Sequence, residues 1–257
     1  IAEERLYSVQ PTLKRAAWIS VLFAVVWLGP PVAVIWAFGL DDVFSRMSSN
    51  FTNLQYYFKY VTNSLGRMSQ FRLDEVFVYL VRNYIQAGKA PGTKSEEMQK
   101  IVNDATRMEP LFVGKKASNL VLFDRQNQPV TLYAQTAPMI LLVFWQPDCS
   151  HCKREMPLLK NISERYKNKG LKVMAVCGKS GDEAADCWKF QDEQALPADW
   201  LVLADPPRRS GMANLFNLRT FPRIFLLDEN KNIVWKRAGE ASEMEMEAAL
   251  GKLGAGR

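Results

Sequence analysis

The sequence predicts an α/β fold with a mixed central sheet flanked by helices, preceded by an all-α N-terminal region. Two continuous apolar runs, Met139–Trp145 and Leu171–Cys177, have the length and composition of strands buried on both faces. A segment with the pattern of a helix follows each run, which is typical of a sheet with crossover helices. Between Asp42 and about Arg107 the apolar residues recur at helical spacing.

Composition limits the class of protein. The chain has 257 residues, of which 48% are hydrophobic and 23% charged, enough to bury a core and to divide into two units. The net charge is +6, but Lys and Arg are scattered and form no basic stripe, so we expect no nucleic-acid partner. Four cysteines are too few to form a disulfide framework for a chain of this length, so each cysteine is judged by its position.

Region 1–41 contains an uncharged apolar stretch from Ala16 to Leu40. Its length suits a bilayer, which a helix of about 20 apolar residues can span. Lys14 and Arg15 precede the stretch and predict an N-terminus in the cytoplasm. The alternative is a pair of buried helices broken at Gly29-Pro30-Pro31, because prolines end or kink a helix. Both a membrane anchor and buried helices stay open.

Region 42–110 is predicted to be a helical domain. Apolar residues share one face between Phe51 and Leu65, and a second stripe runs from Leu73 to Tyr84. Gly88–Gly92 interrupts the pattern, and Thr93 with Glu96 forms a capping box that opens a third helix. These stripes are typical of a helical core, and no catalytic cluster is evident in them.

Region 111–257 alternates strands and helices. A hairpin is expected within Asn119–Tyr133, turning near Asn127-Gln128. The remaining elements, in order, are a strand at 139–145, a helix at 149–167, a strand at 171–177, a helix at 182–194, a strand at 200–205, a short helix at 211–216, two antiparallel strands within 223–237 and a helix at 242–253. This order predicts the mixed sheet.

Two cysteines lie where a buried strand becomes a helix, in the stretch FWQPDCSHCKREMP (144–157). Backbone N–H groups and the helix dipole at a helix N-terminus lower the pKa of a thiol, which makes Cys149 the candidate nucleophile. Cys152 is close enough to form a disulfide with it. A protonated His151 would make the couple more oxidising, whereas Asp148 acts in the opposite direction, so the net effect has no predicted sign.

Metal binding and a purely structural role fit this cysteine pair less well. A zinc site needs about four ligands, and the chain has a single histidine and no second close pair of cysteines. A purely structural pair of cysteines is the remaining alternative. However, a Cys-x-x-Cys after a strand in an α/β pattern is the usual arrangement of a redox dithiol.

A second candidate feature is Pro222, which directly precedes a buried strand. The residue before it, Phe221, is expected to be extended. A cis bond here would present free backbone groups to a substrate strand near Cys149. An ordinary trans proline at the first residue of a strand is equally compatible with the sequence.

Together, the run FWxxxCxxCKxExP, the strand that ends at Trp145 and the turn Thr220-Phe221-Pro222 before a terminal hairpin resemble the thioredoxin superfamily. They are similar in particular to TlpA-like, cell-envelope thiol-disulfide oxidoreductases, and the resemblance covers roughly Gly114 to the C-terminus. The preceding helical domain and linker resemble a group of thioredoxin-like proteins common in Bacteroidota. The resemblance therefore implies a thioredoxin-like fold.

The resemblance also implies roles for individual residues. Cys149 would be the attacking cysteine, Cys152 the resolving cysteine and Pro222 the cis-proline, with Trp145 and Phe221 supporting them. Glu155 matches an acidic residue that TlpA-like reductases use near the active site. A partly buried carboxylate there can exchange a proton with Cys152, although a surface Glu is the simpler alternative. Asp148 is a departure, since many relatives have Trp before the first cysteine.

The expected function is a thiol-disulfide oxidoreductase that exchanges disulfides with protein partners through the Cys-Ser-His-Cys dithiol. It is expected to need no cofactor beyond that redox-active disulfide, and to work with a redox partner protein. The expected location is the cell envelope or periplasm, with residues 16–40 as the candidate inner-membrane anchor. The alternatives are a thiol peroxidase and a non-catalytic binding or scaffold module. The sequence leaves open the direction of electron flow and whether Cys177 and Cys187, each typical of a small buried residue, form a second disulfide.

Overall fold

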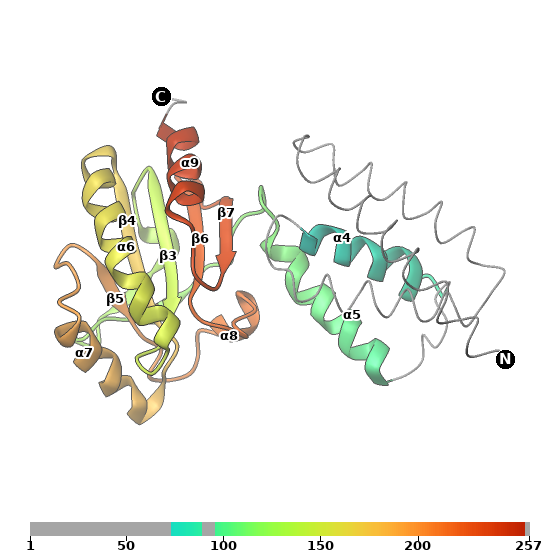
Figure 1. Ribbon diagram of the computed structural model, residues 1–257. Coiled ribbons are helices and arrows are strands. Elements are labelled where there is room, and N and C mark those ends of the chain that lie inside the picture. Colours follow the sequence, from blue (N-terminus) through green and yellow to red (C-terminus); the bar gives the residue numbers. More distant parts are fainter. Residues whose placement is uncertain (1–72, 89–95, 255–257) are drawn as a thin grey trace, which may run out of the picture.

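The computed structural model describes residues 73–88 and 96–254 (Figure 1). The apolar stretch 16–40, the helical stripe that ends at Leu65 and the capping residue Thr93 lie outside these ranges. Within them, no helix has the length and apolar character needed to cross a bilayer.

A five-stranded mixed sheet forms the centre of the C-terminal unit, with strand order β5-β4-β3-β6-β7 (Figure 1). The central strand β3 (Met139–Trp145) pairs in parallel with β4 (Leu171–Cys177) and antiparallel with β6 (Arg223–Asp228). The edges are β5 (Leu201–Leu203), parallel to β4, and β7 (Ile233–Ala238), antiparallel to β6. The predicted mixed sheet is confirmed.

Helices cover one face of the sheet and a mixture of short elements covers the other. Alternate residues of β3, such as Leu141 and Trp145, pack against a helical layer: α6 (Ser150–Tyr166), α7 (Ala184–Glu193) and α9 (Glu243–Gly254). The intervening residues, such as Phe144, face the short α8 (Met212–Leu215) and a ribbon of β1 (Val121–Phe123) and β2 (Pro129–Thr131). Every residue of β3 is buried because both faces are covered.

Short 3-10 turns account for most differences from the predicted boundaries. The helix expected from residue 182 begins with such a turn, Gly181–Glu183, before α7. The strand expected at 200–205 pairs with β4 over Leu201–Leu203, and the next residue, Ala204, instead forms a bridge to Phe123. The other 3-10 turns are Glu109–Leu111, Leu132–Ala134 and Lys167–Lys169.

The helical segments that the structure describes before residue 110 lie on the β7 side of the sheet (Figure 1). Helix α4 (Leu73–Leu80) continues into a π-helical turn (Val81–Ile85) and packs against α5 (Glu96–Met108), which confirms the predicted stripe. Asp74 forms an ion pair with Lys236 of β7, and burial lowers the pKa of Lys236 although Asp74 opposes that effect. The start of α4 is thus linked to the edge strand β7 through the side chain of Lys236, which also donates to the carbonyl of Leu111.

Candidate active site

The candidate redox centre lies where β3 passes into α6. Cys149 is the N-cap residue of α6 and has an extended backbone (φ −85°, ψ 110°), so its side chain turns back over the first helical turn. The backbone N–H of Cys152 donates to Cys149 Sγ over 3.1 Å. A backbone N–H aimed at sulfur, added to the helix dipole, favours the thiolate when the pair is reduced.

The two cysteines are bonded to each other but differ in accessibility. Their Cα atoms are 5.2 Å apart, as expected for the two ends of one disulfide. Cys152 is completely buried, whereas Cys149 is partly exposed. A partner molecule can therefore reach only the sulfur of Cys149.

The Phe221-Pro222 segment lies directly beside Cys149. Its peptide bond is cis, one of the two alternatives that the sequence left open. The carbonyl oxygen of Phe221 is 3.4 Å from Cys149 Sγ, although the two residues are far apart in the sequence. The Phe221 ring packs on Gly178, where an added Cβ would lie 2.6 Å from the ring atom Cζ. Glycine at 178 therefore leaves the space that the Phe221 ring occupies.

Glu155 is buried in α6, three residues after Cys152, with 4% of its surface exposed. The alternative of a surface glutamate is therefore wrong. Its Oε1 atom accepts a hydrogen bond of 3.0 Å from the N–H of Ala241. Burial raises the pKa of Glu155, and the hydrogen bond from Ala241 only partly opposes this.

We expect Glu155→Gln to remove a pH dependence of stability. Between the ordinary pKa of a glutamate and the raised pKa of Glu155, the folded chain holds a proton that the unfolded chain has lost. Stability of the wild type therefore falls as pH rises through that window, by about 1.4 kcal/mol for each pH unit that separates the two pKa values. The amide of Gln can still accept the N–H of Ala241 but does not titrate. Denaturant unfolding from acidic to neutral pH should show the unfolding free energy of the variant rising relative to that of the wild type as pH increases.

The control for this experiment is Glu164→Gln, which changes a glutamate of the same helix whose side chain is 70% exposed. The Glu164→Gln variant should keep the fall in stability with rising pH that Glu155 gives the wild type, because Glu155 is unchanged in it. A Glu155→Gln curve that keeps the same fall would contradict the raised pKa of Glu155.

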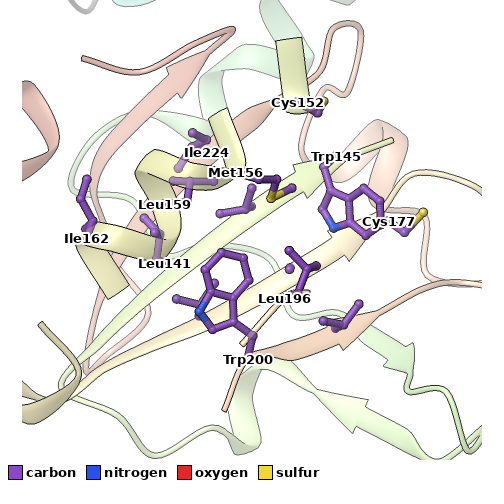
Figure 2. Packing of buried hydrophobic residues seen from close by; sticks show 14 of the residues in the cluster. Leu141, Trp145, Cys152, Met156, Leu159, Ile162, Cys177, Leu196, Trp200 and Ile224 are labelled. Carbon is purple, nitrogen blue, oxygen red and sulfur yellow. The ribbon is translucent and has the colours of Figure 1, made fainter. Parts of the chain in front are cut away.

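Trp145 and a second disulfide pack in the core next to the candidate redox centre. The Trp145 ring stacks on Phe190 of α7, with ring centroids 4.5 Å apart. Cys177, opposite Trp145 in the sheet register, is bonded to Cys187 of α7, and both cysteines are fully buried. Figure 2 shows Cys152, Trp145 and Cys177 toward the same end of the core cluster. The pairing that the sequence left open is thus present, and it ties α7 to the strand beside the redox centre.

Asp148 and His151, each next to one of the cysteines, contact side chains that come from other elements. Lys179 Nζ is 3.0 Å from Asp148 Oδ2, and this contact holds the pKa of Asp148 below its usual value. His151 Nδ1 is 3.1 Å from Glu240 Oε1, in the loop between β7 and α9.

The sequence interpretation missed both partners. Lys179 follows β4, whose carboxyl end adjoins that of the parallel strand β3, and this signal could have found it. Glu240 has no comparable signal, because a hairpin and a loop bring it to α6.

Metal chemistry has no ligand cluster to support it in the part of the chain that the structure describes. No group of three or more His, Cys, Asp or Glu side chains there is arranged to hold an ion.

A mixed sheet with a Cys-x-x-Cys at the start of α6 and a cis-proline beside it defines a thioredoxin-like oxidoreductase. A family model described as Redoxin matches residues 112–251, and the chain belongs to this family. The resemblance to the thioredoxin superfamily is thereby confirmed. The division into 1–41, 42–110 and 111–257 stays a prediction.

Individual relatives agree with this class. The chain is similar to the thiol-disulfide oxidoreductase ResA of Bacillus cereus, with 26% identity over 145 residues, which is 56% of this chain and 80% of the relative. It is also similar to ResA of Geobacillus kaustophilus, with 26% identity over 148 residues, 58% of this chain and 82% of the relative. A crystal structure of a thioredoxin-like protein from Bacteroides caccae matches with a TM-score of 0.74 at 20% identity. The match covers 94% of this chain and 84% of the Bacteroides chain. At that identity the likeness shows the fold.

Proposed function

We propose that Cys149 and Cys152 are the reacting pair through which this thiol-disulfide oxidoreductase exchanges disulfides with partner proteins. One observation carries the proposal: the only reachable sulfur of the pair, that of Cys149, accepts a backbone N–H at a helix N-terminus while its bonded partner Cys152 is buried. That arrangement separates an attacking sulfur from a resolving one.

In the reducing direction, the Cys149 thiolate attacks one sulfur of a partner disulfide. A bond forms between Cys149 Sγ and that sulfur, and the other partner sulfur leaves as a thiolate and takes up a proton. Cys152 then gives up its proton and displaces the partner from Cys149. The products are the Cys149–Cys152 disulfide and a partner with two thiols, so two electrons have passed to the partner. The reverse sequence oxidises the partner.

Glu155 is the proposed proton acceptor and donor for Cys152. It is buried in the same helix one turn further on, and its raised pKa brings it closer to neutral pH, where proton transfer is most effective. Its hydrogen bond to Ala241 holds the carboxyl in place.

Phe221 and Pro222 are the proposed docking edge for an extended partner segment. The Phe221 carbonyl already lies beside Cys149 Sγ, so a strand laid along this edge would bring its own sulfur to Cys149. The substrates would be protein thiols and disulfides, and a second protein would reset the dithiol. No organic or metal cofactor takes part in these steps.

The proposed location is the cell envelope or periplasm, with residues 16–40 as an inner-membrane anchor. Two disulfides among the described residues, one of them fully buried, support an oxidising compartment. The uncharged stretch has the length of a membrane span.

Cys152→Ser should trap the partner. Serine cannot displace a mixed disulfide, so a covalent complex between Cys149 and the partner should accumulate. Nonreducing electrophoresis after incubation with a disulfide-containing protein would show a band for the covalent complex, and this band would disappear when a reductant is added. The double variant Cys149→Ser/Cys152→Ser is the control and should form no complex. Equal complex formation by the double variant would contradict the roles assigned to the pair.

A further inference from the structure

Asp148, the residue before the attacking cysteine, is held in an ion pair by a residue of another element. Lys179 Nζ lies 3.0 Å from Asp148 Oδ2 and 3.6 Å from Glu183 Oε2. Lys179 is largely covered, with 20% of its side chain exposed, so it has little freedom to leave this position. The negative charge on the residue that precedes Cys149 is thus offset by a positive charge on Lys179.

Glu240 lies beside two basic side chains near the start of α6, Arg154 and His151. Its Oε1 atom accepts a hydrogen bond of 2.8 Å from Arg154 Nε and lies 3.1 Å from His151 Nδ1. Arg154 Nη2 is in turn 2.8 Å from the same nitrogen of His151. One carboxylate therefore faces both side chains.

The backbone around Glu240 is anchored to the redox centre on both sides. The N–H of Gly239 donates to the carbonyl of Pro222 over 2.8 Å, and the N–H of Ala241 donates to Glu155 over 3.0 Å. The loop that carries Glu240 is therefore held between the cis-proline and α6, which keeps the carboxylate beside His151 and Arg154.

We propose that Lys179 and Glu240 are positioning residues that set the reduction potential of the Cys149–Cys152 couple in opposite directions. The inference rests on the proposed function, because it assumes that this pair is the redox couple. Lys179 cancels the charge of Asp148, which would otherwise destabilise the Cys149 thiolate. Glu240 cancels the charge of Arg154, and of His151 when protonated, which would otherwise stabilise it.

The sign of each effect follows from the reduced form. Whatever stabilises the thiolate stabilises the dithiol state and makes the couple more oxidising. Lys179 lowers the pKa of Asp148, and Arg154 followed by His151 lowers the pKa of Glu240, so both carboxylates are ionised at neutral pH. The charged or titratable groups around the centre include Asp148, Lys179 and Glu183 on one side and His151, Arg154 and Glu240 on the other. Exposed Lys153, buried Glu155 and Arg237, which acts on Glu155, complete this set.

The test is equilibrium with glutathione, in which the protein disulfide and two molecules of reduced glutathione give the protein dithiol and one oxidised glutathione. We expect Lys179→Gln to lower this equilibrium constant and Glu240→Gln to raise it, each about threefold to tenfold, which is about 15–30 mV. The changes are modest because the Asp148 and Glu240 side chains are 65% and 43% exposed, and solvent screens their charges.

Rescue variants separate charge cancellation from a structural effect. Asp148→Asn should restore the wild-type constant in the Lys179→Gln background, and Arg154→Gln should largely restore it in the Glu240→Gln background. Lys167→Gln and Glu247→Gln are matched controls, because their ion pairs with Glu164 and Arg165 lie at the far end of α6. Neither control should change the equilibrium constant.

The results distinguish this inference from the function on which it rests. If the wild-type pair reaches equilibrium but Lys179→Gln and Glu240→Gln leave the constant unchanged, move it in the same direction or are not rescued, the inference is overturned. If the wild-type Cys149–Cys152 pair does not exchange with glutathione at all, the proposed function fails before any variant is compared.

Discussion

Cys149→Ser should reduce the rate of protein disulfide reduction to the uncatalysed background. The structure leaves no substitute nucleophile in the pair, because Cys152 is fully buried behind Cys149. A serine hydroxyl is hardly ionised near neutral pH and does not attack a disulfide as a thiolate does. Reduction of insulin by the reduced protein, followed by turbidity, measures the effect directly.

The matched control is Cys177→Ala/Cys187→Ala, which removes the other pair of sulfurs from the same unit. It should keep most of the wild-type rate, because both of those side chains are buried away from a partner. Wild-type turnover by Cys149→Ser would refute its role as the nucleophile. Retained peroxide consumption by Cys152→Ser, together with no disulfide reduction by the wild type, would instead favour the thiol peroxidase alternative.

The same Cys177→Ala/Cys187→Ala variant should lose about 2–3 kcal/mol of unfolding free energy. The bond closes a loop between residues separated by 10 positions, and loss of that constraint on the unfolded chain has about this cost. The disulfide also ties α7, which carries the Phe190 ring stacked on Trp145, to the end of β4. The loss should therefore include weaker packing behind the redox centre.

Denaturant unfolding of the oxidised proteins measures this loss, with the midpoint falling and the slope nearly unchanged. Cys177→Ser/Cys187→Ser is a useful second variant. It places two hydroxyls in a buried site and should be less stable than the alanine pair. A change below about 0.5 kcal/mol in the alanine variant, the size of an ordinary surface substitution, would show that the bond has no stabilising role.

The sequence alone was sufficient for the framework and for the candidate reacting residues. The runs at 139–145 and 171–177 predicted β3 and β4 because a strand buried on both faces needs a continuous apolar run, a local signal. The spacing of Cys149 and Cys152 at a strand-to-helix junction is likewise local, and so is the position of Pro222 before a strand. Patterns of this kind depend on neighbours along the chain, which the sequence displays directly.

Only the tertiary structure decided what surrounds those residues. The cis bond at Pro222, the burial of Glu155 against Ala241 and the bond between Cys177 and Cys187 each depend on segments that folding brings together. The same holds for Lys179 and Glu240, which offset charges that the sequence shows as uncompensated. The physical reason is that electrostatics and burial act through space, so the environment of the dithiol is set by the packing of β4, α7 and the loop before α9 around α6.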